Sequence, residues 1–144
     1  MIFVDTSAFL ALVNEKDKNH AAAIQFLEEI KNGKIRIKKI ITSDYIIDET
    51  LTRIRYSVGH KEAVEWGMDI FASRVIEKIE IGSEIFGSAW ELFCTYKDKK
   101  FSFTDCTSFT LMKKRGIEKV FSFDSDFERV GFTQINQNSN SIPS

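Results

Sequence analysis

The chain has 144 residues, a length typical of one domain, and 43% of them are hydrophobic, which is enough for a core. Its 20 basic and 21 acidic residues nearly cancel, so bulk charge does not indicate a nucleic-acid-binding protein. Cys94 and Cys106 form no Cys-x-x-Cys pattern, which argues against a disulfide framework and a zinc site, and we interpret both as core residues.

The first residues carry no signal for secretion. The segment MIFVDTSAFLALVNEKDK lacks the basic region and the small-residue cleavage site of a signal peptide. No apolar run approaches the roughly 20 residues that cross a membrane. We therefore expect a cytoplasmic protein without a membrane partner.

Short apolar runs alternate with amphipathic segments along the chain. The runs that predict strands or extended segments are 1–4, 40–42, 75–81, 118–124 and, more weakly, 132–135. The segments with helical periodicity and with Ser, Asp or Gly at their ends are 6–13, 17–31, 43–57, 61–72, 83–97 and 104–115.

This alternation predicts an α/β fold, with a mostly parallel central sheet covered by helices on both faces. No internal repeat or linker interrupts the pattern. We therefore expect one domain over residues 1–135, followed by a loose polar C-terminal tail over 136–144.

Four acidic residues stand where a metal-dependent nuclease would carry them. Asp5 and Asp124 each follow a short apolar run, and in α/β sheets ligands bind beyond the carboxyl ends of the strands. Glu49 and Asp105 lie within predicted helices. Carboxylates gathered without a cation repel one another, a penalty that a divalent ion removes. A set of oxygen ligands without His or Cys favours Mg²⁺ or Mn²⁺, as one or two ions, over zinc.

Each carboxylate also has a structural interpretation that requires no metal. Asp5 can cap a helix, and Asp105 can complete a capping box with Ser102. Asp124 can shape a turn with the aspartate two residues later, and Glu49 can pair with the arginine four residues later. The conjunction of all four acids favours the metal site.

Phosphodiester hydrolysis is the chemistry that such a site predicts, because the ions bind phosphate oxygens and activate water. Thr6 and Ser122 lie beside Asp5 and Asp124, and we expect their hydroxyls to orient a carboxylate or a water molecule.

Four ordered segments resemble the PIN-domain ribonucleases, specifically the VapC-type toxins of toxin–antitoxin modules: MIFVDTSAFLALVN, SDYIIDETLTRIR, SFTDCTSFTLMKKRGI and VFSFDSDFERVGF. The resemblance implies a three-layer α/β/α fold, an RNA substrate, a homodimer and a VapB-like antitoxin. It also implies an acidic pocket around Mg²⁺ or Mn²⁺, formed by Asp5, Glu49, Asp105 and Asp124, with Asp126 as a fifth candidate.

Basic residues that can contact RNA form three groups. Five lie within 31–39, and three lie at 113–115, where a helix end also favours cations regardless of function. Arg53 and Arg55 form the third group. Arg53 shares a helix face with Glu49 and is our candidate contact.

The apolar side chains exceed what a small core requires. We expect some of them to remain partly exposed, as docking surfaces for an antitoxin helix and a dimer mate. The candidates are Trp66, Phe71, Ile85, Phe86, Trp90 and Phe93.

Three other functions stand beside the nuclease. A phosphatase with an aspartyl nucleophile would need a second Asp two residues after Asp5, where this chain has Ser7. A catalytically silent PIN-like module for RNA binding or assembly, and an RNA-processing nuclease that is not a toxin, share the fold. The complete acidic set favours an endoribonuclease with Asp5, Asp105 and Asp124 as metal ligands, in which Glu49 binds metal or positions the attacking water.

Overall fold

Five strands form the centre of the structure, in the order β3-β2-β1-β4-β5. The computed structural model describes residues 1–136. The strands are β1 Ile2–Val4, β2 Ile40–Ser43, β3 Ile76–Ile79, β4 Lys119–Phe121 and β5 Thr133–Gln134. All four strand pairings are parallel, which confirms the predicted sheet.

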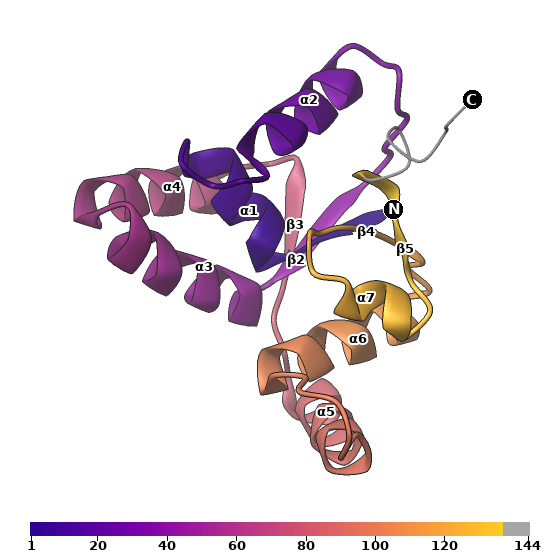
Figure 1. Cartoon of the computed structure of the whole chain (residues 1–144). Helices are drawn as coiled ribbons and strands as arrows, with labels where there is room; N and C mark the ends of the chain where they lie inside the picture. Colours follow the sequence, from indigo (N-terminus) through magenta and orange to yellow (C-terminus); the bar gives the residue numbers. More distant parts are fainter. Residues whose placement is uncertain (137–144) are drawn as a thin grey trace.

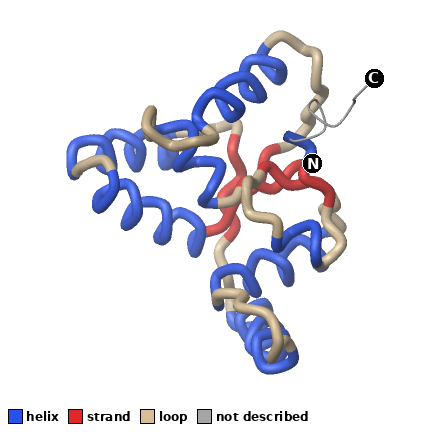
Figure 2. Tube along the Cα trace, in the orientation of Figure 1, coloured by secondary structure: helices blue, strands red, loops and turns tan. Residues whose placement is uncertain are grey.

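Helices cover both faces of this sheet (Figure 1). They are α1 Thr6–Val13, α2 His20–Lys31, α3 Asp44–Ser57, α4 His60–Ala72, α5 Ser83–Thr95, α6 Phe103–Arg115 and α7 Asp126–Arg129. Figure 2 shows α1 to α4 on one side of the strands and α5 to α7 on the other. The reason is topological: the chain steps outward from β1 to β3 and then returns to the far side of β1, and right-handed crossovers in opposite directions lie on opposite faces. The predicted three-layer α/β/α fold is confirmed.

The core lies between the sheet and the helix layers. All three residues of β1 are buried, as is expected of the middle strand of a sheet with two covered faces. In α6 the seven consecutive residues 106–112 are all buried, because this helix is enclosed by the sheet, α5 and the C-terminal aromatic residues. The helix that carries Asp105 is therefore held on several sides.

The structure departs from the prediction at the start of the second helix, at a short helix near the C-terminus and at Cys94. The second helix begins at His20 and not at 17, because Asp17 accepts a hydrogen bond from the Asn19 N–H and forms a turn. The four-residue helix α7 was not predicted. Cys106 is buried, but Cys94 is exposed, so the prediction of a core Cys94 was wrong. Cys94 lies on α5, a helix in which Ala89 is the one buried residue.

The end of the described chain is packed against the sheet. Asn136, which we expected to begin a loose tail, is buried. Its side-chain amide accepts a hydrogen bond from the Ser122 N–H (3.1 Å) and donates one to the Ser122 carbonyl (3.0 Å). The Gln134 amide donates to the Asp124 carbonyl. The remainder of the predicted tail, 137–144, lies outside the described residues.

No helix within residues 1–136 is long and apolar enough to cross a membrane.

Replacing Asn136 by Ala is expected to lower the free energy of unfolding by about 1–3 kcal/mol, because the N–H and carbonyl groups of buried Ser122 lose their partners. Urea denaturation measures the change. Gln25→Ala removes an exposed amide from α2 and serves as the matched control, with an expected effect within about 0.5 kcal/mol. Equal stability of Asn136→Ala and the unaltered protein would contradict the bracing role of this side chain.

Candidate metal centre

The carboxyl ends of β1 and β4 lie side by side at the point where the strand order reverses. Val4 and Phe121 are partners in the register, so Asp5 and Ser122 leave the sheet at the same height. The Asp5 N–H donates to the Phe121 carbonyl (3.1 Å), which extends the pairing by one residue. Such a reversal point opens a crevice in which ligands of α/β proteins bind.

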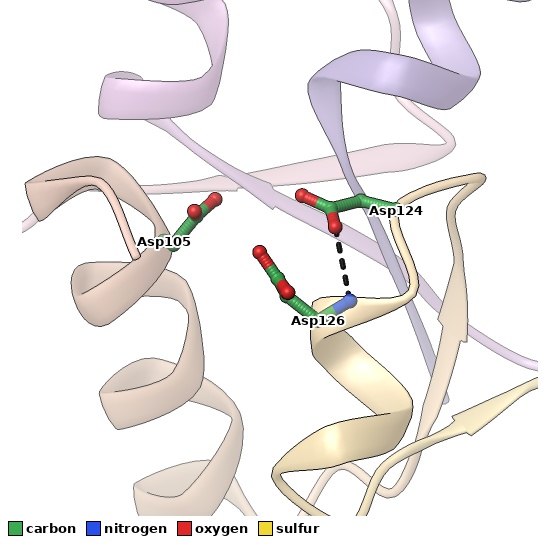
Figure 3. A group of neighbouring side chains, drawn as sticks. All are labelled: Asp105, Asp124 and Asp126. Atoms are coloured by element: carbon green, nitrogen blue, oxygen red, sulfur yellow. Dashed lines mark hydrogen bonds between the residues drawn. The ribbon is translucent and has the colours of Figure 1, made fainter. Parts of the chain in front are cut away.

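Three aspartates converge at this edge of the sheet (Figure 3). Asp105, Asp124 and Asp126 each place one carboxylate oxygen within 4.8 Å of an oxygen of the other two. Asp105 comes from the first turn of α6, Asp124 from the segment between β4 and α7, and Asp126 is the first residue of α7. Residues far apart in the sequence are thus brought together, as the acidic pattern predicted for Asp105 and Asp124.

Local hydrogen bonds orient each of the three aspartates. The capping box predicted for α6 is present: Asp105 Oδ2 accepts from the Ser102 N–H (3.0 Å), and Ser102 accepts from the Asp105 N–H (2.9 Å). Asp124 Oδ1 accepts from the Asp126 N–H (2.9 Å), which forms the predicted turn. Asp126 also pairs with Arg129 at 2.9 Å.

Asp5 lies deeper than the other acids and is only 5% exposed. It caps α1, as predicted, by accepting a hydrogen bond from the Ser7 N–H (3.4 Å). The same oxygen, Oδ2, accepts from the hydroxyls of Ser7 (2.9 Å) and Ser122 (3.0 Å). Asp5 stands outside the group of three within 4.8 Å, but its charge acts on Asp105.

Three of these acids, Asp5, Asp105 and Asp126, have a raised pKa and so hold their protons more tightly than free carboxylic acids do. Burial raises the pKa of Asp5 to about 6, against the opposing effect of the hydrogen bonds from Ser7 and Ser122. Burial, followed by the negative charges of Asp5 and Asp124, raises the pKa of Asp105 to about 7. Burial and Asp124 also raise the pKa of Asp126. A divalent cation would offset this crowding of negative charge, and a donor set made of carboxylate oxygens fits Mg²⁺ or Mn²⁺.

Two predicted site residues lie differently from the expectation. Glu49 is half-buried on α3 and does not join the group of three aspartates. The ion pair between Glu49 and Arg53, our structural alternative, is not formed among the described residues. The Thr6 hydroxyl accepts from the Thr50 hydroxyl (3.3 Å) and makes no hydrogen bond to a carboxylate in the described chain, so the expected orienting role of Thr6 is not seen.

Ser7 also contacts Asp5 and was not predicted, because only hydroxyls adjacent to an aspartate in the sequence were expected to orient a carboxylate. A Ser two positions after an N-cap residue was the available signal, since an N-cap side chain bonds to backbone groups at that spacing. Ser122, which was predicted, does donate to Asp5.

The predicted basic groups lie at different edges of the sheet. The group at 31–39 precedes β2 and therefore lies at the amino edge, where Lys39 pairs with Glu77 at 2.8 Å. The group at the end of α6 lies at the same edge, where Arg115 also pairs with Glu77 (2.9 Å). The aspartates lie at the opposite edge. The third basic group, which contains Arg53, lies on α3. This helix begins at the same edge as the aspartates.

Comparisons with known proteins agree with this architecture. Residues 2–133 match the model of the PIN domain. The chain belongs to the PIN-domain family. It is 33% identical over 135 residues to the 23S rRNA-specific endonuclease VapC20 of Mycobacterium tuberculosis, covering 94% of this chain and 98% of VapC20. That similarity places this PIN domain among the VapC proteins and confirms the resemblance seen in its motifs.

One further relative and two solved structures also resemble this PIN domain. A VapC ribonuclease of Archaeoglobus fulgidus is 28% identical over 126 residues, which cover 86% of this chain and 77% of the relative. The crystal structure of VapC20, described as a sarcin–ricin loop cleaving toxin, superposes with a TM-score of 0.84 at 32% identity, covering 92% of this chain and 97% of VapC20. Rickettsia felis VapBC2, crystallised with a DNA fragment from its promoter, matches with a TM-score of 0.65 at 16% identity, over 92% of this chain and 96% of the other, which shows the fold alone.

Affinity of this PIN domain for Mn²⁺ is expected to rise with pH. Carboxyls with a pKa near 6 and 7 keep their protons in acid, and an ion must displace those protons to bind. Calorimetric titration is expected to show binding at least about 20-fold weaker at about pH 5.5 than at about pH 7.5.

Asp105→Asn is the matched control for this titration. The amide keeps the shape of the side chain but does not titrate, so the variant binds more weakly and with a smaller dependence on pH. An affinity of the unaltered protein that is the same at both pH values would contradict the raised pKa of Asp105 and Asp5 as the cause.

Proposed function

We propose that this protein is a metal-dependent endoribonuclease, the VapC toxin of a toxin–antitoxin pair. The observation that carries the proposal is the convergence of Asp105, Asp124 and Asp126 beside buried Asp5, at the edge of the sheet where α/β proteins bind ligands. The VapC relatives that it resembles over most of its length are named as endonucleases or ribonucleases.

The proposed roles follow from position and chemistry. Asp5, Asp105 and Asp124 are the principal ligands of one or two Mg²⁺ or Mn²⁺ ions, and Asp126 is an additional ligand. When bound, the metal supplies positive charge for the phosphate oxygens and acidifies an attacking water. Glu49, on α3 at the same edge, binds metal or positions that water.

Local hydrogen bonds prepare the carboxylates for this role. Asp105 uses Oδ2 in its capping box, and Asp5 uses Oδ2 for the serine hydroxyls, so each has a second oxygen for an ion. Ligand oxygens that are already oriented lose little freedom when an ion binds, which favours affinity.

Ribosomal RNA is the proposed substrate class, because the relative with 33% identity is named as a 23S rRNA-specific endonuclease. Arg53 is the proposed contact to the RNA backbone. It is exposed, and α3 begins at the acidic edge. Because ribosomal RNA and such an antitoxin are found in the cytoplasm, the protein is proposed to act there. Its single domain is proposed to include residues 1–136.

A VapB-like antitoxin and a second copy of the chain are the proposed protein partners. Two exposed apolar stripes support two docking surfaces. One stripe lies on α4, with Val64 45%, Met68 68% and Phe71 64% exposed. The other lies on α5, on the opposite face of the sheet, with Phe86 47%, Trp90 56% and Phe93 42% exposed. Two other candidates, Trp66 and Ile85, are half-buried. Contiguous apolar stripes of this kind are typical of interaction sites.

Asp5→Asn is expected to abolish RNA cleavage with the fold intact, because it removes one negative charge from the ion-binding group and keeps the side-chain shape. The assay incubates purified, antitoxin-free protein with ribosomal, transfer and messenger RNA, with Mg²⁺ or Mn²⁺ and with EDTA. A loss of at least about 100-fold is expected for the variant.

Asp69→Asn is the matched control, because Asp69 is an exposed acid of α4 and its replacement should leave cleavage unchanged. Cleavage by Asp5→Asn at the rate of the unaltered protein would contradict the nuclease assignment. No cleavage by folded protein with Mn²⁺ demonstrably bound would favour the silent RNA-binding module, and cleavage that does not arrest cell growth would favour an RNA-processing nuclease.

Glu49→Gln is expected to slow cleavage by at least about 100-fold, because a neutral amide can neither accept a proton from water nor neutralise an ion. Calorimetry with Mn²⁺ separates the two proposed roles. Weakened binding identifies a ligand, and unchanged binding identifies a residue that positions water. A variant that cleaves as fast as the unaltered protein would remove Glu49 from the site.

A further inference from the structure

Ser7 joins two strands of the site through a single hydroxyl. It lies in the first turn of α1, beyond β1, and its Oγ contacts Asp5 Oδ2 at 2.9 Å. Ser7 Oγ also accepts a hydrogen bond from the backbone N–H of Phe123 (2.9 Å), which lies in the segment that carries Asp124. The Asp5 carboxylate and the backbone before Asp124 are therefore bridged by one side chain.

The direction of the Ser7 hydroxyl follows from its neighbours. A backbone N–H can only donate, so the Phe123 N–H occupies an acceptor site of Ser7 Oγ. The hydroxyl proton of Ser7 is then free to point at Asp5 Oδ2, an oxygen that accepts hydrogen bonds when ionised. Hydrogen bonds to an ionised group are roughly twice as strong as neutral ones, which favours this direction.

Ser122 repeats the arrangement from the other strand. Its Oγ accepts from the Asp124 N–H (3.0 Å) and donates to Asp5 Oδ2 (3.0 Å). The hydroxyls of Ser7 and Ser122 lie 3.1 Å apart, and both send their protons to the same carboxylate oxygen. Two consecutive N–H groups of the Asp124 segment, those of Phe123 and Asp124, are thus tied to Asp5 through two hydroxyls.

The consequence for Asp5 is an unequal pair of oxygens. Oδ2 accepts from the Ser7 N–H and from both hydroxyls, and none of these three donors is bonded to Oδ1. The backbone N–H of Thr6 also stabilises the ionised carboxylate, but less than either hydroxyl does. Rotation of the carboxylate would break two charge-assisted hydrogen bonds, so the side chain is held in one orientation. Removal of one serine would loosen that orientation and also release the backbone of the Asp124 segment.

We propose that Ser7 is a positioning residue of the metal centre, which holds Asp5 Oδ2 and the Phe123 backbone so that Asp5 Oδ1 is presented to a divalent ion. An effect of Ser7 on RNA cleavage rests on the proposed nuclease function, but its effect on ion binding does not. Its effect on ion binding is measured in the absence of RNA. A positioning role differs from a purely structural one, because ion binding then requires the hydroxyl of Ser7 and not only a side chain of its size.

The test compares Mn²⁺ binding by calorimetry in folded, metal-free variants. Ser7→Ala is expected to bind Mn²⁺ roughly tenfold more weakly than the unaltered protein, as is usual when a partner of a ligand is removed. Ser7→Thr keeps the hydroxyl on a half-exposed side chain and is expected to restore binding to within about threefold. Ser7→Cys keeps the volume but offers only a weak donor, so it should resemble Ser7→Ala and replaces that variant if Ser7→Ala does not fold.

Ser108→Ala is the matched control, because the Ser108 hydroxyl is buried on α6 and makes no hydrogen bond within the described chain. Its Mn²⁺ affinity should equal that of the unaltered protein. Equal Mn²⁺ affinity of folded Ser7→Ala, or of Ser7→Cys in its place, overturns the proposal. If Ser7→Ala weakens Mn²⁺ binding but the unaltered protein cleaves no RNA, the positioning role stands and the nuclease assignment fails.

Discussion

The parallel pairing of β1 with β4 is the constraint on which the metal centre depends. These strands are neighbours in space although three crossovers separate them along the chain, and their last residues are in register. Asp5 and Ser122 therefore leave the sheet together, and the segment after Ser122 brings a carboxylate oxygen of Asp124 within 4.8 Å of one of Asp105 on α6. The same reversal of strand order sends the helices to both faces, and in α/β proteins ligands bind at such a reversal point.

Structural and functional roles are combined in the same carboxylates. Asp5 caps α1, Asp105 completes a capping box, and Asp124 closes a turn. The capping and turn roles are therefore compatible with a metal site, although for each side chain alone they are an alternative to it. A carboxylate has two oxygens, so one can satisfy a helix end or a turn while the other contributes to the crevice. The local bond also restricts rotation, which is what a ligand of an ion needs.

Acids held in this way oppose folding unless a cation is bound. Burial raises the pKa of Asp5 and Asp105, which means that ionised forms of both are less stable in the fold than in water. The surroundings are correspondingly well braced. The α6 helix is buried along most of its length, and the amides of Gln134 and Asn136 hold the backbone that leads to Asp124. A site of this kind trades stability for pre-organised charge.

The sequence by itself determined the alternation of strands and helices, the parallel sheet, and the aspartates that follow β1 and β4. Periodicity, capping and turn formation act between residues a few positions apart, so they are visible in a linear pattern. Only the tertiary structure decided that the hydroxyl of Ser7, and not that of Thr6, bonds to Asp5. It also decided that Asn136 belongs to the packed domain, and that the basic group at 31–39 lies at the edge away from the acids. Ser7 and Ser122 are 115 positions apart, and their contact depends on the order of the strands, which no local pattern encodes.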